Sequence, residues 1–118
     1  MSDVLIASTG SYRFDIDALQ AAASSRWPGM RRFDGAGSGD GQLQHVGADN
    51  RLLDVTSLRA GHGLGVEGDP ERVAEFMAWL TTQPGFPSDG SIEVYNWALD
   101  IMHLAPGAQV GELLASLP

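Results

Sequence analysis

Residues 69–80, which read DPERVAEFMAWL, decide the fold of this chain because they carry its clearest helical pattern. Asp69 has a side chain that can cap a helix N-terminus, and Pro70 suits the first helical position, where no backbone N–H is needed. An apolar stripe then recurs at helical spacing: Val73, Phe76, Met77 and Leu80. Burying each of these side chains contributes roughly 1.5–3 kcal/mol, which exceeds the contribution of the cap. The helix therefore needs a sheet to cover.

The strands of this sheet are predicted on both sides of the helix. They are residues 4–7, 30–33, 42–46, 52–58, 64–67 and 92–104. The first is a continuous apolar run, which indicates a strand buried on both faces. In the last, the apolar alternation changes phase near residues 96–98, which predicts a β-bulge or a tight hairpin that splits two strands. We expect the helix to face Val4, Ile6, Val55 and Val94.

Two more helices complete the predicted fold. Asp15 can cap a helix over residues 16–27, which has an apolar stripe and ends at Pro28-Gly29, and a short helix is expected near residues 110–117. The order of elements predicts one α+β domain over residues 1–118, with a mostly antiparallel sheet, two main helices packed on one face and a short C-terminal helix. A ferredoxin-like core with an added hairpin is the first topology that we expect.

The composition of the chain excludes several kinds of chemistry. There is no Cys, so disulfides, thiolate nucleophiles and Cys-bound zinc are ruled out. All basic residues are Arg, and without Lys there can be no Schiff base and no Walker-type phosphate loop. The formal net charge of −8 opposes nucleic-acid binding, which needs a basic surface. An acidic surface instead suits solubility or a basic protein partner that is steered by charge.

The sequence predicts a cytoplasmic protein without a membrane partner. No apolar run approaches the roughly 20 residues that a membrane-spanning helix needs. The first residues, Met1-Ser2-Asp3, lack the basic region and long hydrophobic core of a secretory signal.

The histidines do not form a metal-binding pattern. His45, His62 and His103 lie in separate segments, and Asp100 precedes His103 by three residues. In a strand that odd separation places the two side chains on opposite faces, and only a bulge or local helix would bring them together. We therefore expect no metal site and no cofactor.

Evidence for catalysis is weak. His62 lies between two glycines, where an exposed ring could act as a general base, but the nucleophile pattern G-x-S-x-G is absent. Asp54, Glu67 and Glu93 lie in strand-like segments, where two facing carboxylates could share a proton. Their alternation with apolar neighbours is explained more simply by a solvated sheet face.

The candidate binding residues are acidic or aromatic. The acidic candidates lie in loops or at strand ends, where side chains can project: Asp34, Asp40, Asp49, Glu67 and Asp89. Trp79 lies off the stripe of the central helix, and Trp97 lies at the phase change of the last strand. Large aromatics outside the main core are typical of interface anchors, although both Trp residues could equally belong to a core packed on two sides.

These features favour a small protein-binding protein. The first hypothesis is an inhibitor or immunity-type protein that neutralises a basic, toxin-like or nuclease-like protein partner. The alternative is a ferredoxin-like domain that binds a small molecule or regulates, with a homodimer formed through its sheet. A small enzyme that uses His62 or His103 with a carboxylate is the least favoured reading.

Overall fold

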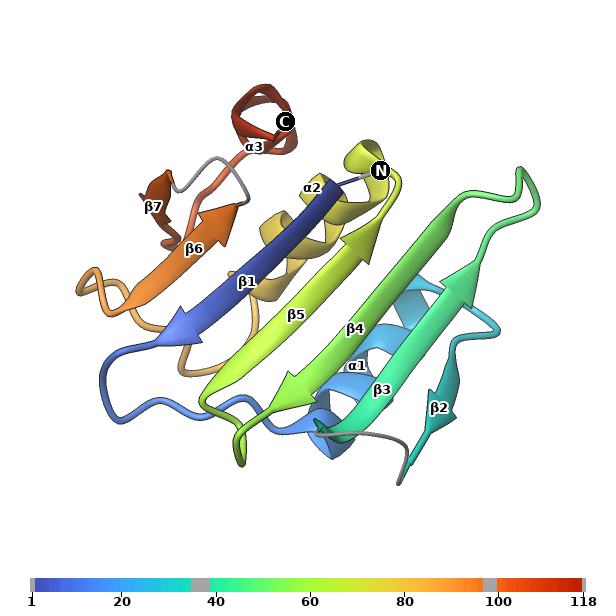
Figure 1. Cartoon of the computed structure of the whole chain (residues 1–118), viewed down its shortest axis with the longest axis horizontal. Helices are drawn as coiled ribbons and strands as arrows, with labels where there is room; N and C mark the ends of the chain where they lie inside the picture. Colours follow the sequence, from blue (N-terminus) through green and yellow to red (C-terminus); the bar gives the residue numbers. More distant parts are fainter. Residues whose placement is uncertain (1, 35–38, 97–99, 118) are drawn as a thin grey trace.

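Across the residues that the computed structural model describes, which are 2–34, 39–96 and 100–117, the chain forms one seven-stranded sheet and three helices (Figure 1). For residues 39 and 40 only the backbone is described. The strands are β1 (Ser2–Ser8), β2 (Arg31–Phe33), β3 (Gly39–Val46), β4 (Leu52–Leu58), β5 (Gly63–Gly68), β6 (Ile92–Asn96) and β7 (Ile101–His103). They lie in the order β2-β3-β4-β5-β1-β6-β7, and neighbouring strands are antiparallel. The predicted α+β class is confirmed, but the sheet is larger than a ferredoxin-like core.

The helices are α1 (Ile16–Arg26), α2 (Pro70–Leu80) and α3 (Val110–Ser116). Both α1 and α2 lie behind the sheet in Figure 1, so they cover the same face. The two predicted N-caps are confirmed. An Asp15 carboxylate oxygen accepts from the backbone N–H of Asp17 at 3.0 Å, and Asp69 accepts from the N–H of Glu71 at 3.2 Å. The capping residues thus fix where the two main helices begin.

The core lies between the sheet and the helices that cover it. Every member of the predicted stripe of α2 is fully buried: Val73, Phe76, Met77 and Leu80. The strand residues expected to face it belong to the same core: Val4, Ile6, Val55 and Val94. The prediction that α2 packs against these strands is therefore confirmed, and α2 is stabilised mainly by this apolar contact.

One sequence expectation is wrong, and two others are made more specific by the structure. β1 is not buried on both faces, because Leu5 is 40% exposed while Val4 and Ile6 are buried. The segment 92–104 is split into β6 and β7, which form an antiparallel pair, as one of the two predicted alternatives required. In α3 only Leu113 is fully buried, so this helix is amphipathic but shallowly packed. No helix in the described residues is long and apolar enough to cross a membrane.

Candidate binding surface

The face of the sheet opposite α1 and α2 carries no helix in the described part of the chain (Figure 1). Because side chains alternate along a strand, residues next to the buried ones point to this side. The open face, as we use the term, consists of the odd-numbered residues of β1, β2, β5, β6 and β7 and the even-numbered residues of β3 and β4 from Gln42 onward.

A row of carboxylates crosses the open face near the end where β1 begins. Glu67 of β5 lies opposite Asp3 of β1 on one side and opposite Asp54 of β4 on the other. Glu67 is exposed, and one Asp54 carboxylate oxygen accepts from the side-chain amides of Gln42 at 2.6 Å and Gln44 at 3.3 Å. We call Asp3, Glu67 and Asp54 the acidic row. Three carboxylates on adjacent strands make this end of the open face locally acidic.

Apolar side chains surround the acidic row on the same face. Leu5 is 40% exposed, and Ile101 on the neighbouring edge is 55% exposed. Phe33 of β2 and Val46 of β3 project from the same face near the other edge of the sheet, and they are 42% and 57% exposed. Tyr95 lies between the first two in register, opposite both Leu5 and Ile101. Single exposed apolar residues are ordinary, but several on one uncovered sheet face indicate an interaction surface.

Next to this apolar group lies a small polar cluster. The Tyr95 hydroxyl donates to Glu93 at 2.5 Å, and the His103 ring nitrogen Nε2 lies 3.4 Å from the other Glu93 carboxylate oxygen. The hydrogen bond to Glu93, with some burial, raises the pKa of Tyr95 above its usual 10.0. Asp100 is exposed just before β7. Among the described residues no group of three or more His, Asp or Glu side chains could hold a metal ion.

The acidic residues predicted to bind a partner are distributed over two ends of the sheet. Glu67 and Asp49 lie at the end where β1 begins, whereas Asp34 and Asp89 lie at the end where β1 finishes. Asp34 is paired with Arg32 at 2.9 Å, and Asp89 accepts from the backbone N–H of Ser91 at 3.0 Å. The structure therefore does not bring these four carboxylates into one place. Of the four, Glu67 alone points from the open face.

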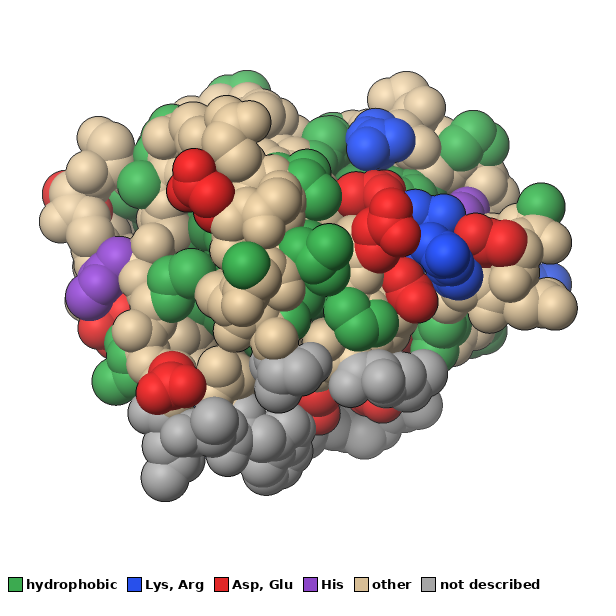
Figure 2. All heavy atoms as spheres, turned by 90° about the horizontal axis from the view of Figure 1, so that it is seen from above, with side chains coloured by type: hydrophobic (Ala, Val, Ile, Leu, Met, Phe, Trp, Pro, Cys, Tyr) green, Lys and Arg blue, Asp and Glu red, His purple; other side chains and the backbone are tan. Residues whose placement is uncertain are grey.

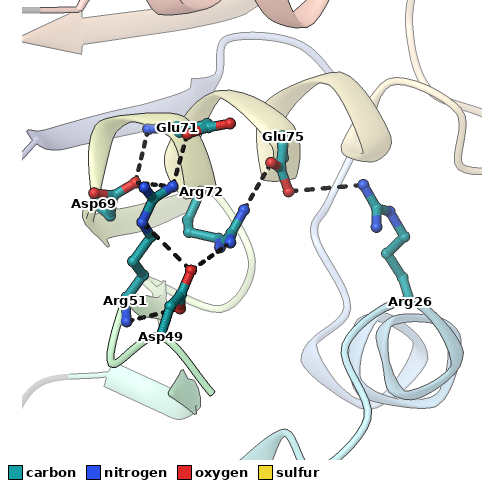
Figure 3. A network of polar contacts seen from close by, with 7 residues as sticks. All are labelled: Arg26, Asp49, Arg51, Asp69, Glu71, Arg72 and Glu75. Atoms are coloured by element: carbon teal, nitrogen blue, oxygen red, sulfur yellow. Dashed lines mark hydrogen bonds and ion pairs between the residues drawn. The ribbon is translucent and has the colours of Figure 1, made fainter. Parts of the chain in front are cut away.

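Asp49 belongs to an ion-pair network that joins the β3–β4 turn to α2. It lies 3.0 Å from Arg72 and 3.4 Å from Arg51, and Arg51 in turn contacts Glu71 at 2.7 Å (Figure 3). Glu75 extends the network toward α1 through Arg72 at 2.8 Å. In the view onto this end of the molecule, acidic and basic side chains interleave (Figure 2). These charges satisfy one another, which leaves little net attraction for a partner.

The hydrogen bond from the backbone N–H of Arg51, which is 3.1 Å from Asp49, is the largest factor that lowers the pKa of the Asp49 carboxyl below its usual 3.8. The charge of Arg72 acts in the same direction, while desolvation opposes both. Asp49 therefore acts mainly as a structural group that holds the turn against α2.

Trp79 is half-buried on α2 and packs against the core. Its ring makes an edge contact with Trp27, with ring centroids 5.2 Å apart, and a tilted contact with Phe76 at 5.6 Å. It lies on the helix side of the sheet, away from the acidic row. Trp97 and the side chain of Asp40 lie outside the described residues.

A hollow of about 380 Å³ opens at the other end of the open face from the acidic row. Leu5 and Ala7 of β1 and Leu58 of β4 border it, and Arg59 and His62 stand at its end. Leu5, Arg59 and Asp3 were not among the binding residues predicted from the sequence. The alternation of Asp3 and Leu5 with Val4 and Ile6 was the available signal, but the apolar run at residues 4–7 masked it.

Comparison of the chain with models of known protein families, with curated proteins and with solved structures gave no match. The charges, contacts and exposure of the chain's own residues therefore support the proposals that follow.

Proposed function

We propose that this protein binds a basic protein partner on the open face of its sheet and thereby neutralises it, as an inhibitor or immunity-type protein does. The observation that carries the proposal is the acidic row, Asp3, Glu67 and Asp54, placed in register on three adjacent strands of an uncovered face. A formal net charge of −8 for the whole chain adds a long-range attraction for such a partner.

The acidic row is suited to receive cationic side chains. An Arg or Lys of the partner would form charge-assisted hydrogen bonds with these carboxylates on binding. The amides of Gln42 and Gln44 hold the Asp54 carboxylate in place, so part of the site is ordered before the partner arrives. Glu67, at the centre of the row, is exposed and accessible.

Apolar residues beside the row supply the second element of an interface. Leu5 and Ile101 would lose exposed apolar surface on binding, which contributes about 25 cal/mol for each Å² removed from water. Covering them would also exclude water from the neighbouring carboxylates and strengthen their ion pairs. Charge would thus set the rate of encounter, and apolar burial would prolong the complex.

We also infer that four strands of the sheet form a ferredoxin-like core. What supports this is their spatial order, β4-β5-β1-β6, with α1 following β1 and α2 joining β5 to β6. The added strands are then β2, β3 and β7. Such a core is compatible with either a protein partner or a small ligand, so the topology does not choose between them.

A face-to-face homodimer is the less favoured use of the open face. A symmetric dimer pairs the same patch on both copies, so two acidic rows would enter one interface. That interface would bury carboxylates of like sign, with an electrostatic cost that a basic partner does not incur.

The proposal is tested by capture from the source cell on immobilised protein at low salt, followed by identification of the captured chains. The same capture is run with Glu67→Arg on the open face and with Glu112→Arg, which makes the same change of charge at an exposed position on α3. We expect a basic protein that the wild type and Glu112→Arg capture and Glu67→Arg does not. Equal capture by both variants, or capture of acidic proteins alone, would contradict the proposed function.

A further inference from the structure

The hollow on the open face is lined by apolar side chains, and the residue beneath it is a glycine. Gly63 of β5 forms its floor, and a Cβ atom built there would lie 3.6 Å from a Leu5 methyl carbon and 3.9 Å from the Leu58 Cβ. The two leucines therefore stand on either side of the space above Gly63, and Ala7 closes the wall on the β1 side. A volume of about 380 Å³ is near the lower end of the range for small-molecule pockets.

One end of the hollow is cationic. Arg59 and His62 line it there, and no ion pair or hydrogen bond of either side chain is found in the described part of the chain. Other arginines, such as Arg51 and Arg72, are held by carboxylates. The carboxylate on the far side of β1 is Glu93, which is engaged by Tyr95 and His103. The end of the hollow thus offers donors to an anion.

The turn that presents Arg59 is fixed in an uncommon conformation. Arg59 and Ala60 have φ values of 51° and 55°, a region that residues other than glycine seldom adopt. The turn is held from both sides, because Gly61 accepts from the backbone N–H of Phe14 at 2.8 Å and His62 accepts from that of Ser8 at 2.8 Å. These hydrogen bonds hold the turn, and with it the backbone of Arg59, in a fixed position beside the hollow.

We propose that this hollow binds a short aliphatic monocarboxylate, with its chain between Leu5 and Leu58 above Gly63 and its carboxylate at Arg59 and His62. The charge at the end and the apolar walls select this class of ligand over neutral or cationic molecules of the same length. The acidic row does not line the hollow, although Leu5 belongs both to the hollow and to the apolar surface proposed for the protein partner.

The test is a titration of the full chain with hexanoate, hexanol and hexylamine, followed by calorimetry and by backbone amide NMR shifts. We expect saturable binding of hexanoate with a Kd on the order of a millimolar or tighter, and amide shifts concentrated at Ala7, His62 and Gly63. Hexanol should bind at least about tenfold more weakly, and hexylamine should not bind. Equal affinity for hexanoate and hexanol, no saturation with hexanoate, or shifts centred elsewhere would overturn the proposal.

Two variants test separately how the charge of Arg59 and the space in the hollow contribute to hexanoate affinity. Arg59→Asn removes the cation and keeps a residue that tolerates positive φ, so the chain should stay folded while hexanoate affinity falls about tenfold or more. The matched control is Arg31→Gln on β2, which removes an exposed cation from the same face and should leave affinity unchanged. Ala7→Phe should fill the hollow and abolish binding. Unchanged hexanoate affinity in Arg59→Asn would refute the cationic end.

The two proposals fail separately. Glu67→Arg, which tests the protein partner, should leave hexanoate affinity essentially unchanged, because the acidic row does not line the hollow. Arg59→Asn should in turn leave capture of a basic protein intact.

Discussion

Gly68 lies so close to Leu52 that a Cβ atom at position 68 would be 2.0 Å from the Leu52 carbonyl oxygen. The same oxygen accepts a hydrogen bond from the backbone N–H of Asp69 at 3.0 Å. Gly68 also has a φ of 152°, which side-chain-bearing residues rarely adopt. This contact fixes the start of α2 against the first residue of β4, and it requires glycine.

Replacing that glycine should damage the fold. Gly68→Ala is expected to lower the free energy of unfolding by more than about 1 kcal/mol, because both the backbone angle and the space are incompatible with a methyl group. The matched change is Gly111→Ala in α3, where an added Cβ meets no atom within 4 Å and should stabilise by up to about 1 kcal/mol. Urea unfolding of both variants measures the difference. Equal midpoints would show that the close approach is not needed.

The packing of α2 predicts a large effect at its centre. Phe76 is fully buried, so Phe76→Ala should reduce the free energy of unfolding by about 3–5 kcal/mol through lost burial and a cavity. Leu114→Ala in α3 is the control, because this side chain is 38% exposed and its removal should cost much less. Thermal and urea unfolding report both changes. A melting temperature unaffected by Phe76→Ala would contradict the core described above.

The lowered pKa of Asp49 in the β3–β4 turn should make the free energy of unfolding depend on pH in the acidic range. The folded-state pKa of Asp49 lies below the usual 3.8, so its contribution is fully present above that pH and is lost as the pH falls through the folded value. Asp49→Asn should therefore be less stable than wild type at neutral pH, and the difference should shrink toward about pH 3. Asp89, whose pKa is lowered by hydrogen bonds from Ser91, should behave in the same way. Urea midpoints at the two pH values give the result, and a pH-independent difference would exclude this linkage.

Association with a basic partner should slow as salt rises. The Debye length shrinks from about 10 Å at 0.1 M to about 3 Å at 1 M, so steering by the acidic row would be screened. Burial of Leu5 and Ile101 is far less sensitive to salt, and the dissociation rate should change little. Stopped-flow or surface-binding kinetics separate the two rates. An association rate that does not change with salt concentration would show that charge does not steer the encounter with the partner.

Removal of metal ions should leave the protein unchanged. His103 contacts Glu93, and in the described residues no third ligand joins them in a metal-binding group. A chelator should therefore not shift the melting temperature, as followed by circular dichroism. Stoichiometric zinc or iron in the purified protein would contradict this prediction.

Patterns with a short period in the sequence predicted most of the local structure. The stripe of α2 follows from a repeat of 3.6 residues, and Asp15 and Asp69 act locally as caps, so both could be derived from neighbours in the chain. The expectation that Val55 faces the helix likewise placed the buried side of β4 correctly. These features depend on residues a few positions apart.

The pairing of distant strands could not be derived in this way. Glu67 lies opposite Asp3, a contact across more than half of the chain, and only the register of β1 and β5 brings them together. The same holds for Asp49, which is an exposed loop residue as predicted but is also paired with Arg72 of α2. A candidate site built across strands therefore needs the strand order, which local patterns do not encode.

The two edge strands of the sheet limit how another copy of the protein could extend it. These strands, β2 and β7, are each three residues long. A short edge strand offers few free backbone groups for another copy to continue the sheet, and the exposed Arg31 places a charge on one of these edges. Lengthening β7 by design should therefore create an edge on which copies of this protein can add end to end into linear polymers.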